Sequence, residues 1–220
     1  NWPNFRGPDG DNIVKNAPPL ADSWPAEGPK VLWSIPVGDG YAGAAIFEGC
    51  VYLMDYDMTK RADALRCLSL DDGKEIWRRS YSLNLKRNHG MSRTIPAVTK
   101  DYIVAMSPKC AVVCLDTKTG AKLWERRDLR CNHYRGAGSS PILFNNLLIL
   151  HFDGADAQFV VALDKATGKD VWNVKRSTDY RDLGPDGKPK AEGDLRKGYA
   201  TPQLEMIEGK PVLLSNGAKA

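Results

Sequence analysis

Short apolar runs alternate with polar turns along the whole chain, and the same pattern returns at nearly regular intervals. Three segments of eleven residues align without gaps, at 67–77, 114–124 and 162–172. Each contains an apolar pair, a polar turn with glycine, and an apolar residue followed by tryptophan. Glycine supplies the positive φ that tight turns need, so each segment is predicted to be a β-hairpin. The repeated positions are Gly73, Gly120 and Gly168 in the turns and Trp77, Trp124 and Trp172 at the ends, with Trp33 ending a shortened copy.

A second kind of hairpin is predicted between these segments. Its four copies lie at 45–54, 96–105, 141–150 and 202–215, each an apolar strand, a short polar turn and a second apolar strand. No stretch shows the sustained spacing of three and four residues that an amphipathic helix needs. Four short strands in about 40–50 residues is the period of a β-propeller blade. We therefore predict an all-β protein, a β-propeller of four-stranded antiparallel blades, in which the tryptophans pack between blades.

The composition is that of a globular protein and excludes some classes of partner. Of the 220 residues, 42% are hydrophobic and 26% are charged, and the net charge is +4 at pH 7. That charge is too small to indicate nucleic-acid binding, and no apolar run approaches the roughly 18 residues of a membrane span. We expect neither a nucleic-acid partner nor a transmembrane segment. The five cysteines include no C-x-x-C pair, so their disulfide state stays open.

The turn motif resembles a known repeat. The pattern Leu-Asp-x-x-Thr-Gly-x-x-x-Trp at 115–124 and 163–172 is similar to the PQQ-like (pyrroloquinoline quinone) β-propeller repeat, which the BamB-type outer-membrane assembly factors share. The copy at 67–77 departs from it, with Ser69 where aspartate is usual. The opening stretch 2–10 also looks like the start of secreted bacterial proteins of this kind. The resemblance implies a periplasmic or secreted location.

This resemblance implies a closed ring of seven or eight blades, and the chain supplies about four. We therefore expect an incomplete propeller, either a fragment of a longer protein or a ring completed by another chain. The expected boundaries are an N-terminal extension at 1–29, a partial propeller at 30–220 with a D strand at 30–37, blades at about 41–80, 93–127 and 138–176, a polar, turn-rich surface insertion at 178–196, and a partial blade at 198–220.

The candidate site lies where loops from strand D of one blade to strand A of the next share a face beside the channel. Arginine and lysine side chains there would bind carboxylate or phosphate groups, or simply be solvated. Two successive loops carry an Asn-His pair, Asn88-His89 and Asn132-His133, and these pairs would form hydrogen bonds with the backbone of neighbouring blades. No third metal ligand has a diagnostic spacing, so we predict no metal site, and no catalytic motif is present. The candidate ligand-binding residues are Tyr41, His89, Arg93, His133, Arg135, Lys197 and Tyr199.

Three functions are open on this basis. We favour a non-enzymatic, extracytoplasmic scaffold that binds a protein partner or the remaining blades. The second is a dehydrogenase that holds PQQ and Ca²⁺; such enzymes typically carry two adjacent cysteines, and no two are adjacent here. The family name thus suggests PQQ as a cofactor, but the motifs in this sequence do not support it. The third is a carbohydrate- or small-ligand-binding propeller in which Tyr41, Tyr134 and Tyr199 stack on sugars.

Overall fold

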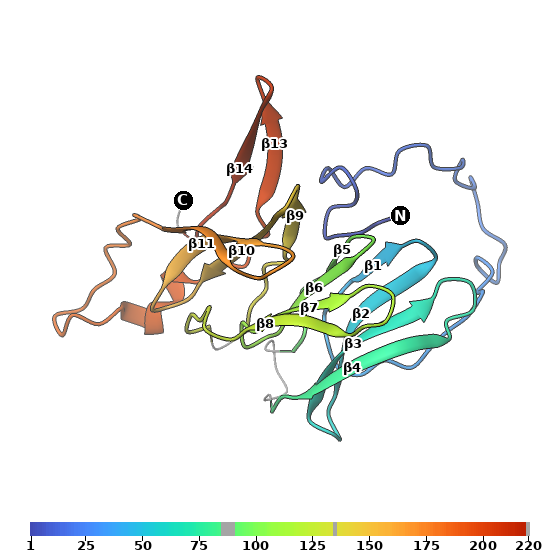
Figure 1. Cartoon of the computed structure of the whole chain (residues 1–220), viewed down its shortest axis with the longest axis horizontal. Helices are drawn as coiled ribbons and strands as arrows, with labels where there is room; N and C mark the ends of the chain where they lie inside the picture. The colour runs from blue at the N-terminus through green and yellow to red at the C-terminus, as the bar shows by residue number, and fades with distance from the viewer. Residues whose placement is uncertain (85–90, 134–135, 219–220) are drawn as a thin grey trace.

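The regular structure is nearly all β (Figure 1). The computed structural model describes residues 1–84, 91–133 and 136–218. Three four-stranded sheets follow one another along the chain, and a two-stranded sheet comes after them. Their strands are β1 (Ala44–Phe47), β2 (Cys50–Asp57), β3 (Ala62–Ser69) and β4 (Glu75–Ser82); β5 (Ala97–Val98), β6 (Tyr102–Met106), β7 (Val112–Asp116) and β8 (Lys122–Arg126); β9 (Ile142–Phe144), β10 (Leu147–Asp153), β11 (Gln158–Asp164) and β12 (Asp170–Lys175); and β13 (Gln203–Ile207) and β14 (Lys210–Leu214).

Within each sheet the strands pair antiparallel in chain order, as a propeller blade requires. The predicted hairpins are confirmed, with turns between β1 and β2, β9 and β10, and β13 and β14 inside the segments where short polar turns were expected. The second and third strands of each complete blade are largely buried, which fits their mostly apolar sequences. We call the sheets blades 1 to 4, with strands A to D in order.

Each of the tryptophans Trp33, Trp77 and Trp124 covers the turn glycine of the blade that follows it. A Cβ on Gly73 would lie 2.7 Å from the Trp33 ring, one on Gly120 2.7 Å from Trp77, and one on Gly168 2.8 Å from Trp124. Each indole N–H also donates to a backbone carbonyl near that turn, at 2.8 Å to Leu70, 3.3 Å to Thr117 and 2.9 Å to Lys165. The repeated Trp-Gly spacing in the sequence is therefore the signature of contact between blades.

Hydroxyl groups join the innermost strands. The Ile95 N–H donates to Ser140 Oγ at 3.0 Å, and the Ser140 N–H donates to Thr201 Oγ1 at 2.9 Å. Each of these residues precedes the proline that opens strand A of its blade. In blade 1 the same place holds Gly43, where a Cβ would lie 2.7 Å from the Ile95 side chain. On the channel side, a side-chain hydroxyl of one blade thus accepts a hydrogen bond from the backbone N–H of the blade before it.

The N-terminal extension lies against the A strands, and Figure 1 shows it beside β1 and β5 before it leaves along one edge. Trp2 and Ile46 exchange backbone hydrogen bonds, and the Val98 N–H donates to the Pro3 carbonyl at 2.8 Å. Residues 30–37, where we expected a D strand, form no strand. A D strand pairs with the C strand of its own blade, and residues 1–29 form no such strand.

The insertion at 178–196 is not simply a surface loop. Tyr180 and Asp182 are buried, and Asp182 pairs with Arg196 at 2.7 Å. Its last part is the 3-10 segment η1 (Lys190–Arg196), where a Cβ on Gly193 would lie 2.7 Å from that of Ala155 in blade 3. The insertion therefore packs on the blade it follows. Across the described ranges no helix combines the length and apolar character that crossing a bilayer requires.

Candidate functional site

Four of the predicted residues come together on the loops between blades, and we call them the loop cluster. The rings of His133 and Tyr199 meet edge to face with centroids 4.6 Å apart, and the Arg93 guanidinium carbon lies 5.7 Å from the Tyr199 centroid. Lys197 is almost fully buried, with its Nζ 3.4 Å from an Asp194 oxygen. These side chains come from three successive connections, so the cluster depends on the blades being neighbours.

Burial determines the charge state of the histidine in this cluster. It lowers the pKa of His133, and the positive charges of Arg93 and Lys197 act in the same direction, while the Gly198 carbonyl at 3.4 Å from Nε2 opposes them. The imidazole is therefore neutral at pH 7. The cluster combines a neutral imidazole, a phenol and the Arg93 guanidinium, a combination suited to binding anionic or aromatic groups, while Lys197 is buried beside Asp194.

A buried ion pair lies behind the loop cluster. Both carboxylate oxygens of Asp153 accept from Arg176 Nε, at 2.8 and 2.9 Å, and His151 Nε2 lies 2.7 Å from Asp153 Oδ2. The His151 Nδ1–H donates to the Ala200 carbonyl at 2.8 Å. A Cβ on Gly198 would lie 2.8 Å from the Asp153 carboxylate. This network fixes the 198–200 backbone that carries Tyr199, and our sequence reasoning did not include it in the site.

The other predicted residues are less well placed for a shared site. Tyr41 has a side chain 64% exposed, and its backbone N–H donates to the Ser92 carbonyl next to Arg93. His89 and Arg135, and Tyr134 of the sugar-stacking hypothesis, lie outside the described residues. The seven predicted residues thus divide into four that meet, one exposed neighbour and two that are not described.

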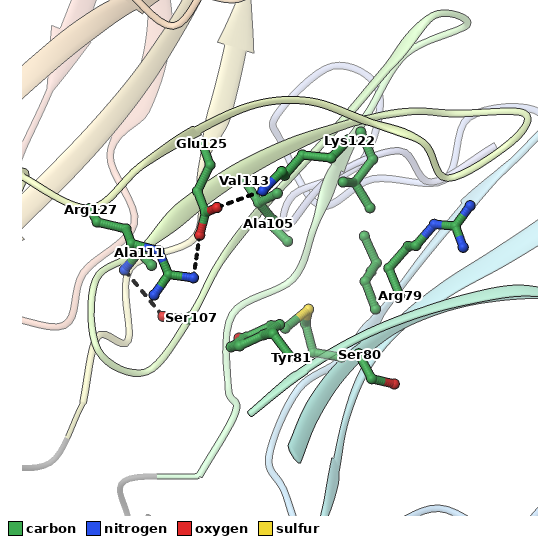
Figure 2. A pocket seen from close by; sticks show the side chains of 13 residues that line it. Arg79, Ser80, Tyr81, Ala105, Ser107, Ala111, Val113, Lys122, Glu125 and Arg127 are labelled. Atoms are coloured by element: carbon green, nitrogen blue, oxygen red, sulfur yellow. Dashed lines mark hydrogen bonds and ion pairs between the residues drawn. The ribbon is translucent and has the colours of Figure 1, made fainter. Parts of the chain in front are cut away.

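A cavity of about 200 Å³ lies between blades 1 and 2 and opens at one side, as Figure 2 shows; we call it the inter-blade cavity. At one side Lys122 Nζ and Arg127 Nη2 both contact the Glu125 carboxylate, at 3.0 and 2.6 Å. The Arg79 guanidinium and the Ser80 hydroxyl are turned away from this group. Its lining is Met54, Leu65, Arg79, Ser80, Tyr81, Ala105, Ser107, Ala111, Val113, Leu115, Lys122, Glu125 and Arg127.

Comparison with known proteins identifies the family to which this chain belongs. The family model of the outer membrane protein assembly factor BamB matches residues 61–196, well over half of the chain. The chain belongs to the BamB family. BamB of Escherichia coli (strain K12) is 30% identical over an alignment of 112 residues, and the match covers 45% of this chain and 26% of that protein. The chain therefore spans about a quarter of the length of the curated BamB relatives it matches.

Solved structures confirm the propeller fold of this BamB-family chain. The quinohemoprotein alcohol dehydrogenase of Comamonas testosteroni superposes with a TM-score of 0.64 at 16% identity, over 93% of this chain and 33% of that chain. The quinohemoprotein alcohol dehydrogenase ADHIIG of Pseudomonas putida HK5 gives a TM-score of 0.56 at 18% identity, over 80% and 28%. At such identities the likeness shows the fold alone. The β-propeller fold is what the chain and these structures share.

The residues described do not fit a PQQ and Ca²⁺ site. Ca²⁺ takes six to eight oxygen ligands. Across residues 1–84, 91–133 and 136–218 there is no group of three or more histidine, cysteine, aspartate or glutamate side chains placed to hold a metal. The Asp153 carboxylate is occupied by Arg176 and His151. We assign no redox step to these blades.

Proposed function

We propose that this chain is a non-catalytic, extracytoplasmic scaffold, and that the loop cluster is a surface on which it binds a protein partner. The observation that carries the proposal is the convergence of Arg93, His133 and Tyr199 from separate blade connections. Arginine and tyrosine are enriched at the centres of protein interfaces, where each supplies contact area and directed hydrogen bonds. The relatives' name, outer membrane protein assembly factor, supports a partner in the bacterial envelope.

The buried network behind the cluster supports the same role. Asp153, His151 and Arg176 hold the backbone that precedes β13, so Tyr199 of the cluster sits on a fixed base. A surface that is ordered before binding loses less conformational entropy when a partner docks. A rigid face of this kind suits recognition of a folded partner.

The test is affinity capture from the cell that makes the protein. The tagged full-length protein is cross-linked in intact cells, and captured envelope proteins are quantified for wild type, Arg93→Ala and Tyr199→Ala. We expect each variant to lose at least about tenfold of one specific partner, the effect of an interface anchor. Unfolding midpoints within a few degrees of wild type would show that the loss is not due to misfolding.

Lys118→Ala is the matched control, because Lys118 is an exposed residue on the blade 2 turn away from the cluster. It should capture the partner as wild type does. The proposal fails if both cluster variants retain full capture while folded. Recovery of the protein in the cytoplasmic fraction would contradict the extracytoplasmic location.

A further inference from the structure

The inter-blade cavity exists because blade 2 carries small residues where blade 3 carries large ones. In blade 3, Phe152 pairs with Phe159 across β10 and β11, and their rings stack with centroids 4.8 Å apart. The equivalent positions in blade 2, counted from the repeat pairs Val104–Cys114 and Ile149–Ala162, are Ser107 and Ala111, whose backbones also pair.

A third position shows the same difference. Leu150 of blade 3 is fully buried against blade 2, and its equivalent in blade 2 is Ala105. Two phenyl rings and one isobutyl group are thus absent from the interface between blades 1 and 2. Interiors are normally packed as densely as organic crystals, and an empty apolar cavity costs stability in proportion to its volume. An opening of about 200 Å³ between buried strands has room for a single aromatic ring.

The cavity has an apolar floor and a charged rim. Met54, Leu65 and Leu115 are buried side chains of its wall. At the rim, Lys122 and Arg127 share the single carboxylate of Glu125, so the three side chains together carry one net positive charge (Figure 2). Both cations are more than half exposed and retain donors for a second carboxylate.

We propose that the inter-blade cavity binds a small aromatic carboxylate, with the ring between blades 1 and 2 in the place of the missing phenyl groups and the carboxylate on Lys122 and Arg127. The site lies between adjacent blades of the chain itself, so it does not depend on the loop cluster or on the proposed partner.

The test uses 3-phenylpropionate as the probe, titrated calorimetrically into the full-length protein. We expect one site with a dissociation constant of about 0.1–1 mM, which is ordinary for a ligand of this size. Ala111→Phe restores the ring that blade 3 has and should abolish binding. Ala105→Leu is a milder filling variant and should weaken binding at least about tenfold, with its thermal midpoint at or above that of wild type.

Two further comparisons test the charged rim. Lys122→Gln and the neutral amide 3-phenylpropionamide should each weaken binding at least about fivefold, because each removes one partner of a charge-assisted contact. Lys118→Gln is the matched control, because Lys118 is an exposed lysine of blade 2 that does not line the cavity, and it should leave the affinity unchanged. The proposal is overturned if wild type takes up no 3-phenylpropionate, if the folded filling variants bind as wild type does, or if the amide binds equally well.

Discussion

Each turn glycine of the repeat meets two demands at once. Gly120 has a φ of +65°, which residues with a side chain rarely adopt, and it also lies directly beneath the Trp77 ring. Positive φ and close contact both exclude a Cβ, so the two effects act on the same atom. The conformational demand alone is present at Gly49, where φ is +75° and a Cβ would meet open space.

We predict that Gly120→Ala lowers the free energy of unfolding by about 2–5 kcal/mol, the sum of backbone strain and overpacking against Trp77. Gly49→Ala should lower it by about 1–2 kcal/mol, because it imposes strain without a clash. Urea unfolding monitored by circular dichroism measures both. Equal losses would show that the indole moves aside at no cost, contrary to the contact we describe.

His133 gives the molecule a pH dependence at the residue scale. Folding lowers its pKa below the ordinary value of about 6.5, so between the two values the unfolded chain binds more protons than the folded chain. The contribution to stability is therefore complete above about pH 6.5 and falls as the pH decreases toward the folded pKa. Asp63 acts oppositely, because burial raises the pKa of its carboxyl.

We predict that His133→Gln reduces the loss of stability between about pH 7.5 and about pH 5, since it removes the group that must be protonated. Urea midpoints of variant and wild type at the two pH values give the difference, in which Asp63 cancels because both proteins carry it. An unchanged pH dependence in the folded variant would show that His133 is protonated as easily in the folded chain as in the unfolded one.

At the scale of strands and turns, each blade is fastened to its neighbour through the D strand. Trp77 on β4 is buried, contacts Gly120 of the next blade and donates its indole N–H to the Thr117 carbonyl. Trp172 occupies the same place on β12 and is half-buried against the blade 3 core and Leu213. Within the described part of the chain, no turn glycine lies beneath Trp172.

This difference predicts unequal costs for the same substitution. Trp77→Ala should lower the free energy of unfolding by about 3–5 kcal/mol, because it leaves a cavity between two blades. Trp172→Ala should cost about 1–2 kcal/mol, as expected for partial burial of the ring. Thermal and urea unfolding distinguish the two variants, and equal costs would mean that the contact with the turn adds nothing to packing within the blade.

The hairpins were predictable because short apolar runs and tight-turn residues are local signals. The strand expected at 30–37 failed for the opposite reason, since a strand also needs a partner that local sequence does not specify. The insertion shows the same limit, because its polar composition hides the pairing of Asp182 with Arg196 that buries part of it. Local pattern identified the elements, and tertiary pairing decided which of them formed.

For the whole molecule, the propeller topology explains which site residues could be found in advance. Arg93, His133 and Tyr199 were predicted to share a face because successive connections of a propeller open on the same side. The Asp153–His151–Arg176 network was missed because it joins residues far apart in sequence inside one blade. The inter-blade cavity did have a signal in the aligned repeats, because Ser107 and Ala111 occupy the positions equivalent to Phe152 and Phe159. That equivalence can be recognised only when the pairing register of the strands is known.

The whole chain should also divide into slow and fast regions of amide hydrogen exchange. Residues 14–27 are exposed and contain no strand, whereas the B and C strands of blades 1 to 3 are paired on both sides. We predict exchange within about seconds in the first region and protection for about hours in the second. Mass spectrometry of peptic fragments measures this, and slow exchange at 14–27 would show that another element covers that stretch.

The contact of each tryptophan with the following turn has a mechanical consequence. Because the same ring, glycine and indole hydrogen bond recur at successive blade interfaces, the blades form a row of similar links rather than one undivided block. When the two ends are drawn apart in an optical trap, the outermost link bears the load first. The extension should then rise in steps, one for each blade, and Trp77→Ala should lower the force at which blades 1 and 2 separate.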